Sequence, residues 1–132
     1  MTVKVAINGF GRIGRLFLRA ALSNSALDIV GINGVRDNAM SAHLLKYDSL
    51  YGTLHHDVAA TDNGLVVDGH EIKTYNIRDS YEFPWGEIGA DVVLESTGKL
   101  RDREKLEYHL KSGAKKVVVS APAKGEDITI VL

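Results

Sequence analysis

The stretch Asn8-Gly9-Phe10-Gly11-Arg12-Ile13-Gly14 is a G-x-G-x-x-G pattern that lies between two apolar segments. Residues 3–7, before it, are rich in β-branched side chains, as in a strand that is covered on both faces of a parallel sheet. Residues 11–23, after it, repeat apolar side chains at the i, i+3, i+4 and i+7 spacing of one helix face. The glycines therefore occupy a turn that leads from a buried strand into a helix.

Each glycine of this turn has its own physical role. Gly9 allows a tight turn, Gly11 lets the backbone approach a pyrophosphate without a Cβ atom in the way, and Gly14 lets the helix pack closely on the strand. The free N–H groups of Arg12 and Ile13, together with the positive end of the helix dipole, favour phosphate. We therefore predict a dinucleotide site at this loop, and the alternative is a plain glycine-rich turn.

The rest of the chain continues the alternation of strands and helices. Further elements are expected at residues 27–33 (strand), around 40–47 (helix), 91–95 (strand), 102–112 (helix) and 116–120 (strand). Gly113 is well placed as a left-handed helix stop. Between about residues 55 and 75, Asn-Gly and Asp-Gly pairs split short alternating pieces, which indicates a small antiparallel insertion. The predicted class is α/β: a Rossmann-type, mostly parallel, doubly wound sheet with helices on both faces.

Composition limits the possible classes of protein. The chain has 132 residues, 25% of them charged, a formal net charge of −1 and no cysteine. This length predicts one domain, residues 1–132, and the balanced charge argues against a nucleic-acid-binding module. Without cysteine these residues hold no thiolate zinc site and no thiol nucleophile. The apolar stretch at the N-terminus is too short for a signal peptide or a spanning helix, so we expect a cytoplasmic protein with no membrane partner.

The last residues, Asp127–Leu132, have the composition of a further strand with nothing after it. An uncovered apolar strand edge invites pairing or aggregation. We therefore expect this chain to be a segment of a longer protein.

Cofactor preference depends on the residues that end the second strand. The dinucleotide fingerprint expects Asp or Glu there, bound to the ribose 2′-hydroxyl, but this chain has Gly34, followed by Arg36. A missing carboxylate removes repulsion against a 2′-phosphate, and a guanidinium can pair with that phosphate. The sequence therefore favours NADP, or use of both NAD and NADP. In the alternative, Gly34 only makes a turn and Asp37 contacts the ribose.

No other pattern in the sequence points to chemistry. The five histidines show no H-x-x-x-H or similar ligand spacing, so no metal site is expected. Glu95 lies at the end of a buried strand, where a carboxylate more often forms local hydrogen bonds than acts in catalysis. There is no Ser-His-Asp order and no nucleophile elbow, and we predict no catalytic residue in these 132 positions.

Taken together, the motifs resemble the N-terminal nucleotide-binding part of phosphorylating glyceraldehyde-3-phosphate dehydrogenases. The similarity extends along essentially the whole chain and is carried by Val5–Arg15, Ala42–Ser49, Glu95–Gly98, Gly113–Val117 and Ser120–Pro122. It implies a glycolytic oxidoreductase that converts glyceraldehyde 3-phosphate to 1,3-bisphosphoglycerate with NAD(P). Hydride would leave a thiohemiacetal formed on a cysteine, within a homotetramer.

The resemblance also implies roles for single residues. Asn8–Gly14 would surround the pyrophosphate, with the backbone of Arg12 and Ile13 as donors. Arg78 and the Ser96-Thr97-Gly98 segment would contact the adenosine, and Ser120 would lie on the nicotinamide side. Gly34 stands where NAD-using members carry the ribose-binding aspartate.

The resemblance places the family's catalytic cysteine and its histidine partner beyond Leu132, so the catalytic domain is expected to be absent here and the segment inactive alone. Two alternatives stay open. Erythrose-4-phosphate dehydrogenase shares much of the N-terminal pattern, and a non-catalytic dinucleotide-binding module would carry the same loop.

Overall fold

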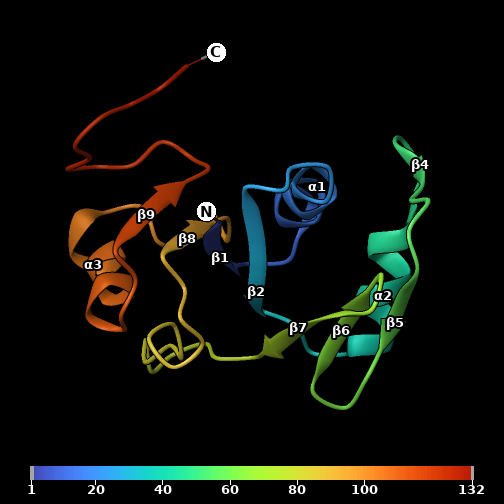
Figure 1. Ribbon diagram of the computed structural model, residues 1–132. Coiled ribbons are helices and arrows are strands. Elements are labelled where there is room, and N and C mark those ends of the chain that lie inside the picture. The colour runs from blue at the N-terminus through green and yellow to red at the C-terminus, as the bar shows by residue number, and fades with distance from the viewer. Residues whose placement is uncertain (1, 132) are drawn as a thin grey trace.

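The computed structural model describes residues 2–131, in which strands and helices alternate along most of the chain (Figure 1). The strands are β1 (Val3–Asn8), β2 (Leu27–Asn33), β3 (Tyr47–Asp48), β4 (Gly52–Thr53), β5 (Val58–Ala60), β6 (Gly64–Val67), β7 (His70–Tyr75), β8 (Val92–Glu95) and β9 (Lys116–Val119). The helices are α1 (Arg12–Ala21), α2 (Asn38–Lys46) and α3 (Arg103–Lys111). The predicted order of strands and helices is confirmed up to β9.

Seven of the strands form one sheet in the order β5-β6-β7-β2-β1-β8-β9. The neighbours from β7 to β9 run parallel, whereas β5, β6 and β7 pair antiparallel with one another. The predicted antiparallel insertion, about residues 55–75, is thus confirmed as these three strands. β3 and β4 form a separate short hairpin, because Tyr47 leaves α2 in an extended conformation and pairs with Thr53. The expected helix around residues 40–47 consequently ends at Lys46.

Helical and irregular segments cover the two faces of the sheet. Val5 and Ile7 of β1 point to one face, where they pack in a cluster with Leu18 of α1 and Leu45 of α2. Ala6 points to the other face and belongs to a second cluster, which is built around the segment between β7 and β8 and is partly covered by α3. The alternation of side chains along β1 therefore produces the predicted doubly wound arrangement.

Capping side chains fix the starts of two of the helices. Asp37 accepts the N–H of Met40 at the start of α2, and Asp102 accepts the N–H of Lys105 at the start of α3. Helix α1 differs, because Gly11 stands at its N-cap position and no side chain caps it. Among the three helices that the structure describes, α1 is therefore the one whose first N–H groups have no side-chain cap.

The register of the parallel strands aligns their carboxyl ends in one row. Asn8 at the end of β1 pairs with Asn33 of β2 and with Glu95 of β8, while Tyr75 and Val119 extend the row on either side. The chain order reverses at β1, since β2 lies on one side of it and β8 on the other. In open α/β sheets such a reversal leaves a crevice outside the strand ends, where ligands bind.

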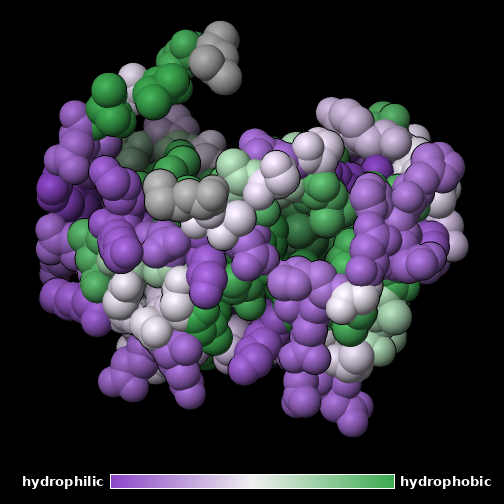
Figure 2. Space-filling model, viewed as in Figure 1, coloured by the Kyte–Doolittle hydropathy of each residue, from purple (hydrophilic) through white to green (hydrophobic). Residues whose placement is uncertain are grey.

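The prediction of a final strand at Asp127–Leu132 is wrong for residues 127–131. Leu132 lies outside the residues that the structure describes. Residues 128–131 have no strand structure and extend away from the sheet beyond β9 (Figure 1). Their apolar side chains project from the body of the molecule (Figure 2). Val131 is 88% exposed. Within residues 2–131 no strand supplies the backbone partners that this segment would need, so a β-rich composition alone does not make it a strand.

None of the helices in the described part of the chain has the length and apolarity that crossing a bilayer requires.

Gly113, predicted as the stop of α3, has a φ of +113° and lies against the segment between β7 and β8. A Cβ atom at this position would lie 2.5 Å from the Cα atom of Gly86. We expect Gly113→Ala to lower the free energy of unfolding by about 3 kcal/mol, through backbone strain and overpacking together.

Gly69→Ala is the matched control, because Gly69 also has a positive φ, +80°, but nothing lies within 4 Å of its Cβ position. Strain alone should cost that variant about 1 kcal/mol. Urea unfolding of both variants measures the difference, and equal losses would contradict a packing role for Gly113.

Candidate functional site

The glycine loop after β1 makes two very close contacts. Gly9 has a φ of +101°, and a Cβ atom there would lie 2.8 Å from the backbone nitrogen of Thr97. A Cβ atom on Gly14 would lie 2.3 Å from the carbonyl oxygen of Gly9. The loops after β1 and β8 therefore touch through backbone, and the first turn of α1 sits directly on the glycine loop.

Gly11 faces open space. Nothing lies within 4 Å of the position where its Cβ atom would be, and the neighbouring Arg12 and Ile13 are exposed. The first N–H groups of any α-helix lack partners inside the helix, and no side chain caps those of α1. A negatively charged group at this surface would thus find free backbone donors and the positive end of the helix dipole.

Two arginines of α1 add positive charge beside the loop. Arg15 donates to the carbonyl oxygen of Phe10 at 3.0 Å, and Arg12 pairs with Asp48 at 3.4 Å. Burial lowers the pKa of Arg15, and the Asp48 carboxylate opposes that shift. A guanidinium nevertheless stays charged at neutral pH, so two arginines and one carboxylate leave a net positive charge beside the loop.

The turn after β2 places Gly34 and Arg36 at the same edge of the sheet. The N–H groups of Gly34 and Val35 both donate to the carbonyl oxygen of Tyr75, at 2.9 and 3.0 Å, and Gly34 has a φ of +96°. Asp37 is engaged as the cap of α2. The side chain of Arg36 is exposed, and within residues 2–131 it makes neither a hydrogen bond nor an ion pair with the protein.

The remaining predicted contacts follow the other parallel strands. Ser120, just after β9, donates its N–H to the carbonyl oxygen of Glu95 at 3.0 Å. Thr97 and Gly98 follow β8 and are exposed, and Arg78 is exposed three residues after β7. The structure thus places every predicted site residue at the carboxyl ends of the parallel strands, in the loops that follow them or in the first turn of α1.

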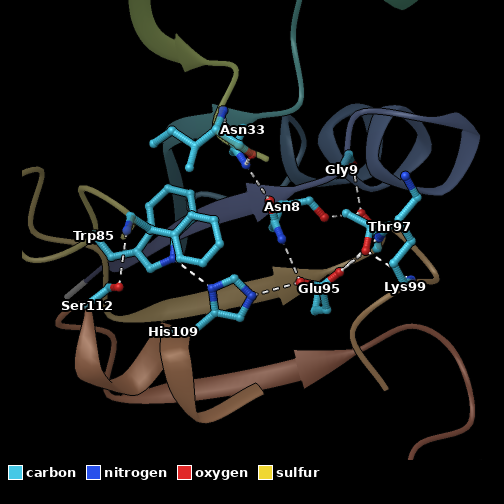
Figure 3. Close-up of polar contacts among 12 residues, drawn as sticks. Asn8, Gly9, Asn33, Trp85, Glu95, Thr97, Lys99, His109 and Ser112 are labelled. Atoms are coloured by element: carbon cyan, nitrogen blue, oxygen red, sulfur yellow. Dashed lines mark hydrogen bonds and ion pairs between the residues drawn. The ribbon is translucent and has the colours of Figure 1, made fainter. Parts of the chain in front are cut away.

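A buried chain of polar side chains lies directly beneath these loops (Figure 3). Asn33 donates to Asn8 at 2.8 Å, and Asn8 donates to Glu95 at 2.6 Å. Glu95 also contacts His109 of α3 at 2.7 Å, and the indole N–H of Trp85 contacts the same histidine at 2.9 Å. Asn8, Asn33, Glu95 and His109 are the buried polar residues of the described chain.

The partners of His109 determine which ring nitrogen carries the proton. The indole N–H of Trp85 can only donate, so Nδ1 of His109 accepts and Nε2 donates to Glu95. Burial of Glu95 opposes its ionisation, but hydrogen bonds from His109, Thr97 and Asn8 outweigh that effect and hold the pKa of Glu95 below its usual value. The network therefore contains a buried carboxylate and a neutral imidazole.

Local sequence patterns describe only part of this network. Glu95 does form the expected local hydrogen bond, from the N–H of Thr97 at 3.1 Å. Its bonds to Asn8 and His109 cross 87 and 14 residues and depend on the register of the sheet. The sequence feature that indicates this network is a polar residue at the end of each of three apolar strands: Asn8, Asn33 and Glu95.

Within residues 2–131, no group of three or more His, Cys, Asp or Glu side chains is arranged to hold a metal ion.

Comparison with known proteins identifies the family. The family described as "Glyceraldehyde 3-phosphate dehydrogenase, NAD binding domain" matches residues 3–103. The glyceraldehyde-3-phosphate dehydrogenase of Geobacillus stearothermophilus is 54% identical over 132 residues, which are 100% of this chain and 39% of that protein. The Thermotoga maritima protein of the same name is 52% identical over 131 residues, 98% of this chain and 39% of its own length.

The glyceraldehyde-3-phosphate dehydrogenase of Streptomyces coelicolor is 50% identical over 133 residues, 100% of this chain and 40% of its own length. The chain therefore spans about two fifths of the length of these curated relatives. The similarity extends over nearly the whole chain, and the uncapped start of α1 lies where the order of the strands in the sheet reverses. The chain belongs to the family of glyceraldehyde 3-phosphate dehydrogenase NAD-binding domains.

Proposed function

We propose that residues 1–132 form the dinucleotide-binding domain of an enzyme that oxidises and phosphorylates glyceraldehyde 3-phosphate to 1,3-bisphosphoglycerate. The observation that carries this proposal is the uncapped start of α1, where Gly11 leaves open space over free backbone donors. The relatives described above carry the name of this enzyme, which supports the triose phosphate over erythrose 4-phosphate as substrate.

The proposed cofactor contacts follow the strand ends. The pyrophosphate binds the N–H groups of Arg12 and Ile13 in the loop Asn8–Gly14. Arg78, Thr97 and Gly98 contact the adenosine side, and Ser120 contacts the nicotinamide side. The nicotinamide, when bound, supplies a hydride acceptor, while the residues of this chain bind and orient it.

We further propose that the site accepts NADP, or both dinucleotides. Three observations support this preference: Gly34 offers no carboxylate, the side chain of Arg36 is exposed without a protein partner among residues 2–131, and Asp37 is already used as the cap of α2. The last of these argues against Asp37 as a substitute ribose ligand.

We propose that these 132 residues bind the cofactor and that the catalytic residues lie outside this segment. These 132 residues contain no cysteine, so they cannot form the thioester of a phosphorylating aldehyde oxidation. The intact enzyme is proposed to be a cytoplasmic homotetramer, as the resemblance implies.

Gly11→Val should greatly weaken dinucleotide binding while leaving the fold intact. The valine side chain meets no protein atom near its Cβ, but it fills the space over the backbone donors of α1. Loss of two or more hydrogen bonds to a charged group corresponds to roughly a hundredfold weaker binding. Calorimetric titration with NAD and NADP measures this effect.

Ala20→Val, at an exposed position near the other end of α1, is the matched control and should bind like the wild type. Unchanged affinity in Gly11→Val would remove the site from the glycine loop.

Gly34→Asp should shift preference toward NAD. The new carboxylate repels a 2′-phosphate and can accept from a ribose hydroxyl. The nearest atom to its Cβ position is 3.5 Å away, so nothing clashes with it, although the φ of +96° strains an aspartate there. We expect the ratio of catalytic efficiencies for NADP and NAD in the intact enzyme to fall by roughly tenfold.

Arg36→Gln keeps the backbone of Gly34 and should lower the affinity for NADP more than that for NAD. If both variants leave the ratio unchanged, positions 34 and 36 do not select the cofactor.

Residues 1–132, produced alone and mixed with glyceraldehyde 3-phosphate, phosphate and NAD or NADP, should form no reduced nicotinamide. The absence of a thiol is the reason. An increase in absorbance at the wavelength of the reduced cofactor would show that this segment is catalytic, and would contradict the proposal that the catalytic residues lie outside it.

A further inference from the structure

The buried polar network borders the loops that carry the proposed cofactor contacts. At one end, the second carboxylate oxygen of Glu95 accepts from both the N–H and the hydroxyl of Thr97. At the other end, Asn33 accepts the N–H of Ile77 at 2.7 Å and donates to the carbonyl oxygen of Ile77 at 2.9 Å. The network therefore fixes the backbone beside Arg78 as well as Thr97 itself.

The two asparagines in the middle of the network lie next to the loops after β1 and β2. Asn8 immediately precedes Gly9, and Asn33 immediately precedes Gly34. The hydrogen bond between these two asparagines ties the end of β1 to the end of β2. The loops after β1, β2, β7 and β8 are thus connected through side chains as well as through the sheet.

Glu95 is the centre of the network, because four donor groups converge on its two oxygens. Asn8 and His109 donate to Oε1, and Thr97 donates twice to Oε2. A buried carboxylate that loses a donor is destabilised and moves to regain one. Any movement of Glu95 would be transmitted to Asn8 and Thr97, and hence to the glycine loop.

His109 differs from the other donors to Glu95 in being far from the loops. It is completely buried, with an exposed fraction of 0%, and it comes from α3, on the side of the network away from the loops. Its ring is held in orientation by the indole of Trp85. It cannot reach a ligand at the strand ends, so any influence on binding must act through Glu95.

We propose that His109 is a positioning residue for the cofactor site, which holds Glu95 in place and thereby fixes the loops that contact the dinucleotide. This inference rests on the proposed function, since it concerns the same site. It adds a residue of α3, remote from the ligand, to the determinants of cofactor affinity.

Two substitutions separate the two hydrogen bonds of His109. In His109→Gln, the side-chain amide can take the place of Nε2 and still donate to Glu95. In His109→Asn, the shorter side chain can take the place of Nδ1 and still accept from Trp85, but the donor to Glu95 is lost. We expect roughly tenfold weaker binding of NAD and NADP by His109→Asn, and affinity close to wild type for His109→Gln.

Val93→Ala controls for stability. Val93 is a buried residue of β8 on the same face of the sheet as Trp85, and it belongs to the neighbouring apolar cluster rather than to the network. Its truncation leaves a cavity and lowers the melting temperature without removing a hydrogen bond. Calorimetric titration and thermal unfolding of the intact protein and the three variants give affinity and stability separately.

The inference is supported if His109→Asn alone loses affinity. It is overturned if His109→Asn binds like the wild type, if His109→Gln is as weak, or if Val93→Ala loses as much at comparable stability. A wild-type protein that binds neither dinucleotide is a different result, because the proposed function itself then fails.

Hydrogen exchange of the wild-type protein provides a test that needs no variant. On saturation with NAD or NADP, the amide of Ile77 and the indole N–H of Trp85 should exchange more slowly, together with the amides of Arg12 and Ile13. Trp85 is fully buried and ends the branch of the network that runs through His109. Slowing at Arg12 and Ile13 alone would overturn the inference, even if His109→Asn does not fold.

Discussion

The carboxylate of Glu95 imposes the main physical constraint on this edge of the sheet. A buried negative charge is tolerated only if donors surround it, and here they come from β1, from α3 and from the loop after β8. These donors converge only because the register places Asn8 beside Glu95. Strand register, the position of α3 and the conformation of the loop at Thr97 therefore depend on one another.

This constraint bears on how the proposed pyrophosphate site could form without a lysine. The side-chain network and the close contact of Gly9 with Thr97 fix the backbone of the loops. With the loops fixed, the N–H groups at the start of α1 are already oriented, so little entropy would be lost on binding the proposed anion. The negative charge of Glu95 is stabilised by uncharged donors below the loop surface.

The sequence predicts the parts of the structure that depend on short-range patterns. The G-x-G-x-x-G turn, the apolar strands and the turn pairs of the insertion are all local, and the strands and helices they predict are found. The bond between His109 and Glu95 is not predictable in this way, because it depends on how α3 packs on the sheet. The tail at residues 128–131 fails for the opposite reason: its composition favours a strand, but pairing requires a neighbour that the described chain does not provide.

Gly34 links backbone geometry to the proposed cofactor preference. Its φ of +96° lets the N–H groups of residues 34 and 35 share one carbonyl oxygen of β7, which sets the direction in which the chain leaves β2. An aspartate at this position would have to adopt a conformation that costs an L residue about 1 kcal/mol or more. An acid here must therefore gain more from the ribose than it loses in the turn. A glycine carries no such strain, which is consistent with the proposal that exposed neighbours such as Arg36, rather than an acid at position 34, contact the ribose side.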